Sequence, residues 1–239
     1  VYTAAIIADY SAVSATRICP SGGHYNMPSA IANVSAGAPR YRRPLSWAML
    51  VRKIAIPVQV LSSRVSDGAL ASIVVDPTSD PSDGFNYHDE RNNPGLDAAR
   101  FTSAWTRVRQ PLGYYIRSEN LASAPGSDFQ LLAQGDVFDN FCNVLFSVGT
   151  PKIDSIVRTN PNGTIYENDA RDLETTLARA CEAQMSGQYQ PANTSIVVDR
   201  SYNIVSNQKV KITGSIGLVG YIREIDMTLQ ITNPLSAAA

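Results

Sequence analysis

The sequence predicts an α+β fold (mixed α/β), with a central mixed β-sheet flanked by helices and a C-terminal β-hairpin or arm. Strand-like runs between turns fill the first third of the chain, and two helical patterns follow in the second half. Near the end, apolar and polar residues alternate over two stretches of about ten residues, which is the period of a half-buried strand. Strands and helices do not alternate regularly, so a doubly wound parallel sheet is not expected.

The composition argues against two classes of partner. The 239 residues are 44% apolar and 17% charged, and 20 basic residues against 21 acidic ones give a net charge of −1. This balance lacks the basic surface that nucleic acid requires, and the one basic cluster (Arg40, Arg42 and Arg43) lies between two prolines, as in a loop. No run of 18 apolar residues is present, as a membrane-spanning helix would need. We therefore expect no nucleic acid partner and no membrane insertion.

The chain is expected to divide into two portions. Residues 1–84 are rich in Gly, Pro and Ser turns and form the N-terminal portion, whereas residues 85–239 are denser in regular patterns and form the C-terminal domain. A strand-like run begins at Tyr2, directly after Val1, without the regions of a signal peptide. We therefore expect the chain to be a fragment of a longer protein.

In the first portion the sequence predicts two helices and two strands. A short helix is expected at residues 29–33, and a longer one at Pro44–Lys53, where Pro44 suits the first position of a helix. Ile54–Leu61 and Leu70–Asp76 are rich in Ile and Val, which is typical of strands.

The middle of the chain predicts a strand pair followed by a helix. Phe101–Val108 alternates in polarity and Gly113–Arg117 is aromatic and β-prone, so the two are expected to lie side by side across the turn at Pro111. Asp136–Val148 places its apolar residues at helical spacing after an acidic first residue, which predicts an amphipathic helix.

The longest predicted helix covers Asn168–Ser186, with Asn168 as its N-terminal cap and Gly187 as its stop. Its apolar stripe is narrow and consists mostly of small residues. One interpretation is that this stripe packs on a sheet and that solvent surrounds the rest; the other is that the outer face binds a partner. The charged residues on the remaining faces are Arg171, Glu174, Arg179 and Glu182.

The two alternating stretches near the end are predicted to be strands, Lys209–Leu218 and Tyr221–Thr232, joined by a tight turn. A terminal strand this regular needs a partner, either in its own sheet or in a neighbouring chain. We favour the neighbouring chain, with Gly187–Pro191, Gly217 and Gly220 as hinges. The apolar side chains that would take part in this strand addition between subunits are Val210, Ile212, Ile225, Met227, Leu229 and Ile231.

No catalytic residue, metal site or cofactor is predicted. His88, Asp89 and Glu90 are consecutive, so on an extended backbone they point to opposite faces and do not converge on one ion. Ser127 follows a glycine, but the second glycine of a nucleophile elbow is missing and no histidine follows it in the chain. The three cysteines lack metal-ligand spacing, and two are expected to be small buried hydrophobes: Cys142 and Cys181, with Cys19 as the third.

The order of several short motifs resembles the C-terminal half of contractile tail sheath proteins, which occur in bacteriophages and in related contractile injection systems. The resemblance covers roughly residues 85–235. Members of that family usually carry an N-terminal arm that contains a strand, and we expect that arm to be absent from this sequence. The motifs, which precede and surround the two predicted helices, are Tyr87-His88-Asp89-Glu90-Arg91, Pro94-Gly95-Leu96-Asp97, Arg100-Phe101, Gly113-Tyr114-Tyr115-Ile116, Gly126-Ser127-Asp128-Phe129, Gly220-Tyr221 and Ile231-Thr232-Asn233-Pro234.

The resemblance implies a structural subunit that polymerises helically around an inner tail tube and contracts to drive that tube through the host envelope. It implies other copies of the chain, the tube protein, the baseplate and the tail terminator as partners, strand addition by the terminal strands, and a virion assembled in the bacterial host cytoplasm. The helix Asn168–Ser186 would face the tube. A tube or baseplate protein of the same machine is the alternative, followed by a hydrolase that uses His88, Asp89 and Ser127.

Overall fold

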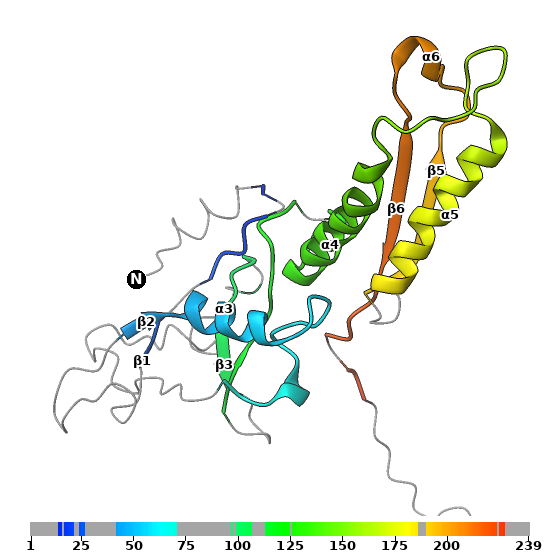
Figure 1. The fold of residues 1–239 in the computed structure, drawn as a ribbon. Helices are drawn as coiled ribbons and strands as arrows, with labels where there is room; N and C mark the ends of the chain where they lie inside the picture. The colour runs from blue at the N-terminus through cyan, green and yellow to red at the C-terminus, as the bar shows by residue number, and fades with distance from the viewer. Residues whose placement is uncertain are drawn as a thin grey trace, which may run out of the picture.

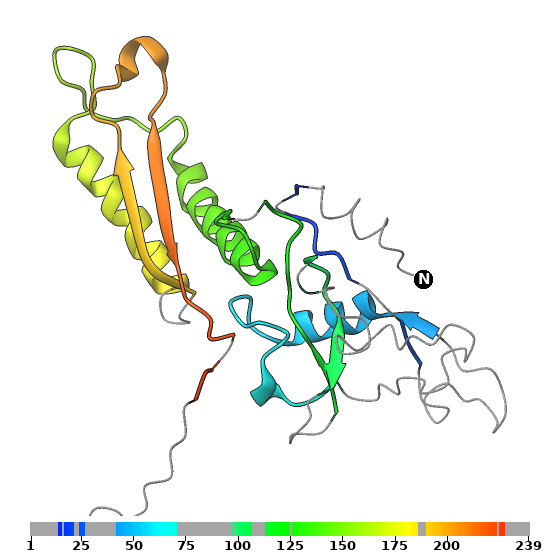
Figure 2. The same ribbon diagram turned by 180° about the vertical axis from the view of Figure 1, so that it is seen from behind.

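The computed structural model describes residues 14–15, 17–21, 24–26, 42–70, 97, 99–106, 113–124, 126–185, 190–223 and 225–227. These residues form helices and antiparallel strands, so the predicted α+β class is confirmed. Residues 132–218 lie together at one end of the molecule, and the elements of residues 24–116 lie at the other end (Figures 1 and 2). The predicted helix at 29–33 and the predicted strand over most of Leu70–Asp76 lie outside the described residues.

The described strands form three two-stranded sheets, and not the central mixed sheet that the sequence predicted. Two of the pairs are β1 (His24–Asn26) with β2 (Arg42–Pro44), and β3 (Ala104–Thr106) with β4 (Tyr114–Ile116). Each of these four strands has three residues, which is the lower end of the usual range of strand lengths. The expected pairing of the segments around β3 and β4 is confirmed, with Trp105 opposite Tyr115.

Helix α3 (Leu45–Ala55) confirms the helix predicted at Pro44–Lys53, with Pro44 directly before its first residue. The strand predicted at Ile54–Leu61 is wrong. Pro57 interrupts that run and has no N–H to give to a sheet. The ammonium of Lys53 donates instead to the carbonyls of Val58 (3.1 Å) and Val60 (3.0 Å), so these carbonyls are satisfied without a neighbouring strand.

Helix α4 (Leu132–Gly149) confirms the predicted amphipathic helix and begins one turn before Asp136. The start is fixed by Gln134, whose side-chain oxygen accepts from the backbone N–H groups of Gln130 and Leu131 at 2.9 Å each. The carbonyl of Glu119 accepts from the N–H of Leu132 at 2.9 Å, which ties this end of α4 to the segment that follows β4.

Helix α5 (Glu167–Gln184) confirms the longest predicted helix. Its capping position is Tyr166 and not Asn168, which is already inside the helix. Ala170, Leu177 and Cys181 are buried on its inner face, as the apolar stripe predicted, and Cys142 of α4 is half-buried. The turn at 150–152 (η2, Thr150–Lys152) leads out of α4.

The third sheet consists of β5 (Pro191–Val198) and β6 (Ile212–Leu218), joined through residues 199–211, which include α6 (Ile204–Asn207). One face of this ribbon packs on the α4–α5 pair, β6 on α4 and β5 on α5. The two hydrophobic clusters between the layers are Val137, Phe141, Val144, Cys181 and Met185, and, nearer α6, Ile165, Ala170 and Val198.

The predicted terminal hairpin is wrong. Its first strand exists as β6, but β6 pairs with β5, and the described residues of the predicted second strand (221–223 and 225–227) do not pair with it. The register places Ile196 opposite Gly214 and Val198 opposite Ile212. The Ile- and Val-rich end of β5 therefore lies beside the first residues of β6 in the same sheet. The described residues after β6 (219–223 and 225–227) form no strand.

The division expected at residues 84 and 85 stays a prediction. Contacts do cross it: the backbone N–H of Ser62 donates to the Glu119 carboxylate, and Lys53 lies 3.4 Å from that carboxylate. The 3₁₀ turn η1 (Val65–Asp67) lies in the same region, where Arg52 donates to the carbonyl of Gly68 at 2.9 Å.

Candidate assembly surfaces

The residues that follow β6, here called the C-terminal segment (residues 219–227), leave the β5–β6 ribbon and run away from it (Figure 1). Two of the predicted strand-addition residues, Ile225 and Met227, expose 67% and 73% of their surface, and Ile222 exposes 85%. A group of exposed apolar side chains on one segment often marks a surface that binds another molecule. Leu229 and Ile231 lie outside the described residues.

The structure separates the other two predicted strand-addition residues. Val210 is partly buried, and its covered side packs against the cluster of Ile165, Ala170 and Val198 in its own subunit. Ile212, the first residue of β6, is 40% exposed. Val210 is therefore less suited to direct contact with another chain than Ile212 is.

Among the described residues, β5 and β6 pair only with each other, so each strand keeps one edge without a strand partner. Such edges are templates for a strand from another chain. Gly217, predicted as a hinge, lies inside β6 opposite Asn193, and a Cβ atom there would come within 2.0 Å of the Asn193 side-chain oxygen. Gly217 therefore allows close approach of the strands. Gly220, in the C-terminal segment, has open space around it.

The four charged residues predicted on the outer side of α5 do not share one environment. Arg179 and Glu182 are exposed. Arg171 is exposed as well and pairs with Glu167 one turn earlier. Glu174 turns toward β5, where its carboxylate accepts from the N–H of Val198 at 2.7 Å and from Arg200 at 2.8 and 2.9 Å. Glu174 therefore fixes α5 to its own sheet.

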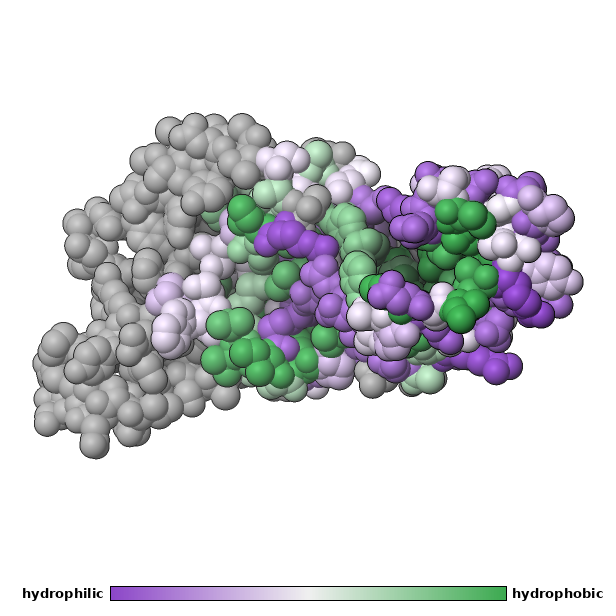
Figure 3. Space-filling view, turned by 45° about the horizontal axis from the view of Figure 1, so that its top comes forward, coloured by the Kyte–Doolittle hydropathy of each residue, from purple (hydrophilic) through white to green (hydrophobic). Residues whose placement is uncertain are grey.

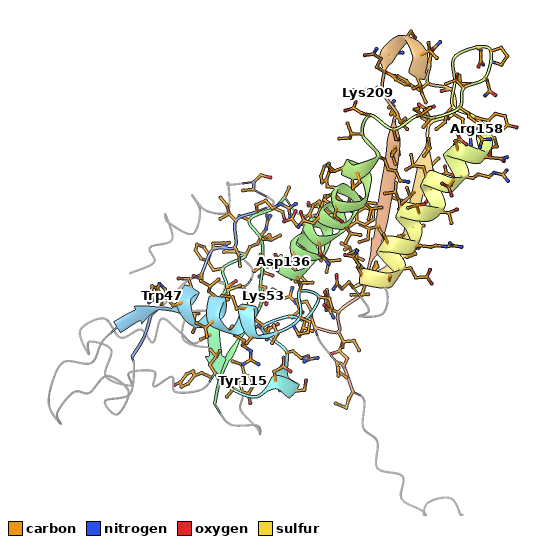
Figure 4. All side chains as sticks on the ribbon, viewed as in Figure 1. Trp47, Lys53, Tyr115, Asp136, Arg158 and Lys209 are labelled. Atoms are coloured by element: carbon orange, nitrogen blue, oxygen red, sulfur yellow. The ribbon has the colours of Figure 1, made fainter. Side chains whose placement is uncertain are left out.

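The N-terminal half of α5 is held by arginines. Hydrogen bonds from Arg200 lower the pKa of Glu174, and those from Arg200 and Arg171 lower the pKa of Glu167. Arg158 binds the Asp169 carboxylate through both its side chain and its N–H, which lowers the pKa of Asp169. Arg158 lies at the end of the molecule far from α3 (Figure 4).

Two further groups of exposed apolar side chains lie outside the predicted sites. Figure 3 shows green, hydrophobic side chains beside the grey region and again at the opposite end of the described part. The first group lies on α3 and the second around the far end of α4 and α6. Their members are Trp47 (58%), Leu50 (59%), Val51 (66%) and Ile54 (77%), and Phe146 (71%), Ile153 (69%), Ile156 (100%) and Val205 (64%).

Lys53 and Asp136 lie near each other where α3 approaches the start of α4 (Figure 4), and Glu119 is the third charged residue of this group. Lys53 lies 3.4 Å from Glu119 and 3.4 Å from Asp136, and the Glu119 side chain has no exposed surface. Burial raises the pKa of Asp136, and the positive charge of Lys53 opposes that rise. The hydroxyl of Tyr221 donates to the carbonyl of Gln59 at 2.7 Å, next to the carbonyls that Lys53 holds.

The residues considered for catalysis are not brought together by the described part of the chain. His88, Asp89 and Glu90 lie outside it, and only the backbone of His24 is described, in β1. The Ser127 hydroxyl accepts from the N–H of Phe129 at 3.2 Å, which is a local turn contact. Burial raises the pKa of Cys19 to about 11, so its reactive thiolate is scarce near neutral pH.

The described residues contain no group of three or more His, Cys, Asp or Glu side chains placed to hold a metal ion. Among the helices in the described ranges, none combines the length and apolar character needed to cross a bilayer.

Sequence reasoning missed Glu119, Lys53 and Tyr221 as a group because they are separated by 66 and 102 positions and carry no local pattern. It also missed the apolar side of α3. A usable signal was present there: Trp47, Leu50, Val51 and Ile54 recur at the spacing of one helical face, beyond the buried Leu45 and Met49 of the opposite face.

No family model matches the chain, and no curated protein matches it. Its fold is similar to that of chains in two cryo-EM structures of the anti-feeding prophage (AFP). The six-fold symmetrised AFP baseplate contains one, with a TM-score of 0.55 and 11% identity over 87% of this chain and 53% of that chain. The AFP helical sheath in its contracted state contains another, with a TM-score of 0.54 and 11% identity over 87% of this chain and 54% of that chain.

The chain therefore spans about half the length of the solved chains that it matches. At 11% identity the likeness concerns the fold. The resemblance that the sequence motifs indicated, to proteins of contractile tails and injection systems, is confirmed at that level.

Proposed function

We propose that the chain is a structural, non-enzymatic subunit of a contractile sheath, which polymerises helically around an inner tube and contracts to drive the tube through a host envelope. The observation that carries this proposal is the C-terminal segment: Ile222, Ile225 and Met227 are exposed on a chain that leaves a two-stranded ribbon with open edges. Similarity of fold to chains of the AFP sheath and baseplate structures supports it.

In this proposal the segment of one copy adds a strand to the β5–β6 ribbon of a neighbour. Main-chain hydrogen bonds would give the affinity, and Ile225 and Met227, followed by Leu229 and Ile231, would fill apolar positions beside the ribbon. The contact joins different surfaces of the two copies, so repeated addition yields an open helical polymer unless the rotation closes into a ring. Ile212 and Val197, 40% and 51% exposed, are accessible apolar residues of the receiving ribbon.

The charged outer surface of α5 is proposed to face the inner tube. Its members are Arg171, Arg179 and Glu182; Glu174, which binds Arg200 and Val198 of its own subunit, would support the helix from behind. The remaining proposed partners are the baseplate and the tail terminator, and the proposed location is a phage tail assembled in the bacterial host cytoplasm. Residues 85–239 are proposed as the tail sheath C-terminal domain.

The alternative is another structural part of the same kind of machine. One observation favours it: the fold matches a chain of the AFP baseplate structure as well as one of the sheath structure, with TM-scores of 0.55 and 0.54. A baseplate component would form a closed disc or ring, whereas a tube component would form a plain cylinder.

Negative-stain microscopy of the full-length gene product tests both readings. A sheath subunit gives hollow cylinders with regular striations, which shorten and widen when triggered. Discs or rings of fixed size would favour the baseplate, and narrow unstriated tubes would favour the tube protein. A product that stays monomeric at all concentrations would contradict every one of these structural roles.

A further inference from the structure

We propose that Tyr221 and Arg223 form a two-point anchor that holds the root of the C-terminal segment on the α3 side of its own subunit, with Glu119 as the positioning residue for both contacts. The anchor fixes the direction in which the segment leaves the molecule. The idea that the anchor transmits a pull between subunits rests on the proposed function. The anchor itself consists of contacts within a single chain.

The first contact joins Tyr221 to the loop that follows α3. The Tyr221 hydroxyl donates to the carbonyl of Gln59 at 2.7 Å, and the side chain is half-buried. Burial, and the nearby negative charges of Glu119 and Asp136, raise the pKa of Tyr221 to about 12, so the hydroxyl keeps its proton for donation. Ile222, the next residue, is 85% exposed, so Tyr221 is the point where the segment turns from the interior to solvent.

The second contact joins Arg223 to Asp97, with the guanidinium 3.5 Å from the carboxylate. Asp97 is itself held in place: Ser118 donates to the carboxylate, Asn120 donates to it at 2.9 Å, and Arg117 lies 3.5 Å away. The carboxylate therefore presents a fixed acceptor to the segment, although half of the Arg223 side chain remains in solvent.

Both acceptors converge on Glu119. The loop that carries Gln59 is tied down on either side, because Lys53 binds the carbonyls of Val58 and Val60, and the N–H of Ser62 donates to Glu119. Lys53 also contacts Glu119 directly. On the other branch, the two residues that hold Asp97 in place, Ser118 and Asn120, flank Glu119 in sequence. The fully buried carboxylate of Glu119 thus orders the loop that receives Tyr221, and the backbone of the same residue joins the two side chains that hold the acceptor of Arg223.

A pull on the segment would accordingly pass into the α3 side of the subunit through Gln59 and Asp97. Between β6 and Tyr221 lie only Val219 and Gly220, and Gly220 has no atoms near its Cβ position. These two residues can therefore absorb a change of angle between the ribbon and the anchored root without strain.

Trypsin cleavage after Arg223 tests the anchor, because the protease can bind this part of the chain only when Tyr221 and Arg223 have left their contacts with Gln59 and Asp97. The full chain is compared in the same assembly state as wild type, Tyr221→Phe and the matched control Tyr202→Phe. Loss of the Tyr221 hydroxyl is expected to raise the cleavage rate at Arg223 roughly fivefold, as expected for one ordinary hydrogen bond when opening precedes cleavage. The control, next to α6 at the far end, should cleave at the wild-type rate.

Asp97→Asn and Glu119→Gln extend the test to the second contact and to the positioning residue. Each should speed cleavage at Arg223 more than cleavage at Arg179 of α5, which serves as an internal reference for general loosening. A wild-type rate at Arg223 in Tyr221→Phe, or an equal acceleration at both arginines in all three variants, would overturn the anchor. Failure to see polymers by microscopy would instead reject the proposed function and leave the cleavage result unaffected.

Discussion

Glu119 shows what one residue contributes to this fold. Its carboxylate is fully buried, accepts from the N–H of Ser62, and faces Lys53, whose own side chain is 11% exposed. Removing one member of a buried ion pair leaves the other charge without compensation, which costs more than the intact pair contributes. Asp136 remains 3.4 Å from Lys53 and offsets part of that cost.

We predict that Glu119→Gln lowers the free energy of unfolding by about 2–4 kcal/mol. Urea denaturation followed by circular dichroism measures this change. Glu182→Gln, on the exposed side of α5, is the control and should stay within about 0.5 kcal/mol of wild type. A stability equal to wild type in Glu119→Gln would show that the buried charge is dispensable.

Gly163 is a residue whose backbone dictates its identity. Its φ is +81°, and a Cβ atom would lie 2.6 Å from both terminal atoms of the Asn203 side chain. That side chain accepts from the N–H of Ser206, donates to the carbonyl of Asn162 at 3.0 Å, and thereby caps α6.

Gly163→Ala is expected to cost about 2 kcal/mol, because it combines a strained φ with a displaced helix cap. The comparison variant is Gly149→Ala at the end of α4, where φ is −76° and nothing lies within 4 Å of the added carbon. That variant should be neutral or slightly stabilising. Thermal unfolding of Gly163→Ala and Gly149→Ala measures the difference, and equal unfolding midpoints of the two variants would contradict this prediction.

At the scale of elements, sequence patterns located most helices and strands but could not assign distant partners. The helical periods of α3, α4 and α5, and the β-prone runs of β3 and β4, are local properties that survive in the fold. The partner of β6 is not local: residues 199–211 separate the two strands, and the first half of β5, Pro191–Thr194, is polar enough to pass for a loop. The hairpin expected after Leu218 is not formed by the described residues that follow it (219–223 and 225–227), which contain no strand.

The candidate surfaces were predictable to a similar degree. Alternation marked Ile225 and Met227, and both side chains are mostly exposed in the single chain. The same alternation marked Val210, which is partly buried against a hydrophobic cluster of its own subunit. A pattern reports that one face is apolar; it does not report whether that face meets its own helices or another subunit.

The contact between α5 and the ribbon is expected to weaken in acid. The folded-state pKa values of Glu174 and Glu167 are lowered from 4.5 by Arg200, so their contribution is present above that ordinary pKa. It is lost as the pH falls through the lower folded-state values. Arg200→Gln removes the main cause of both shifts.

We therefore predict that Arg200→Gln has a lower unfolding midpoint than wild type at pH 6 and that the difference shrinks towards pH 3. Differential scanning calorimetry over this range provides the measurement. The groups are partly exposed to solvent, so added salt should shrink the difference as well. A difference that stays constant with pH would indicate that Arg200 acts through packing alone.

For the whole molecule, assembly is predicted to depend on the exposed apolar residues of the C-terminal segment and not on its charges. Ile225→Asp or Met227→Asp should abolish cylinders or reduce them at least tenfold at equal concentration, because an unpaired carboxylate would be buried at the junction. Both residues are mostly exposed in the single chain, so circular dichroism should remain that of wild type.

Asp226→Asn, on the opposite side of the same stretch, is the matched control and should assemble normally. Electron microscopy and sedimentation measure the outcome. Wild-type cylinders from both aspartate variants would exclude this segment as the coupling surface.

The residues that bind Tyr221 and Arg223 are synthesised before the C-terminal segment. Gln59 precedes Tyr221 by 162 residues, and Asp97 and Glu119 also leave the ribosome before it. Because earlier parts of a nascent chain fold first, the docking place for the root is complete when the root emerges. In the proposed assembly, a nascent chain therefore offers no coupling segment to its neighbours on the same messenger RNA until the α3 side of its own body has folded.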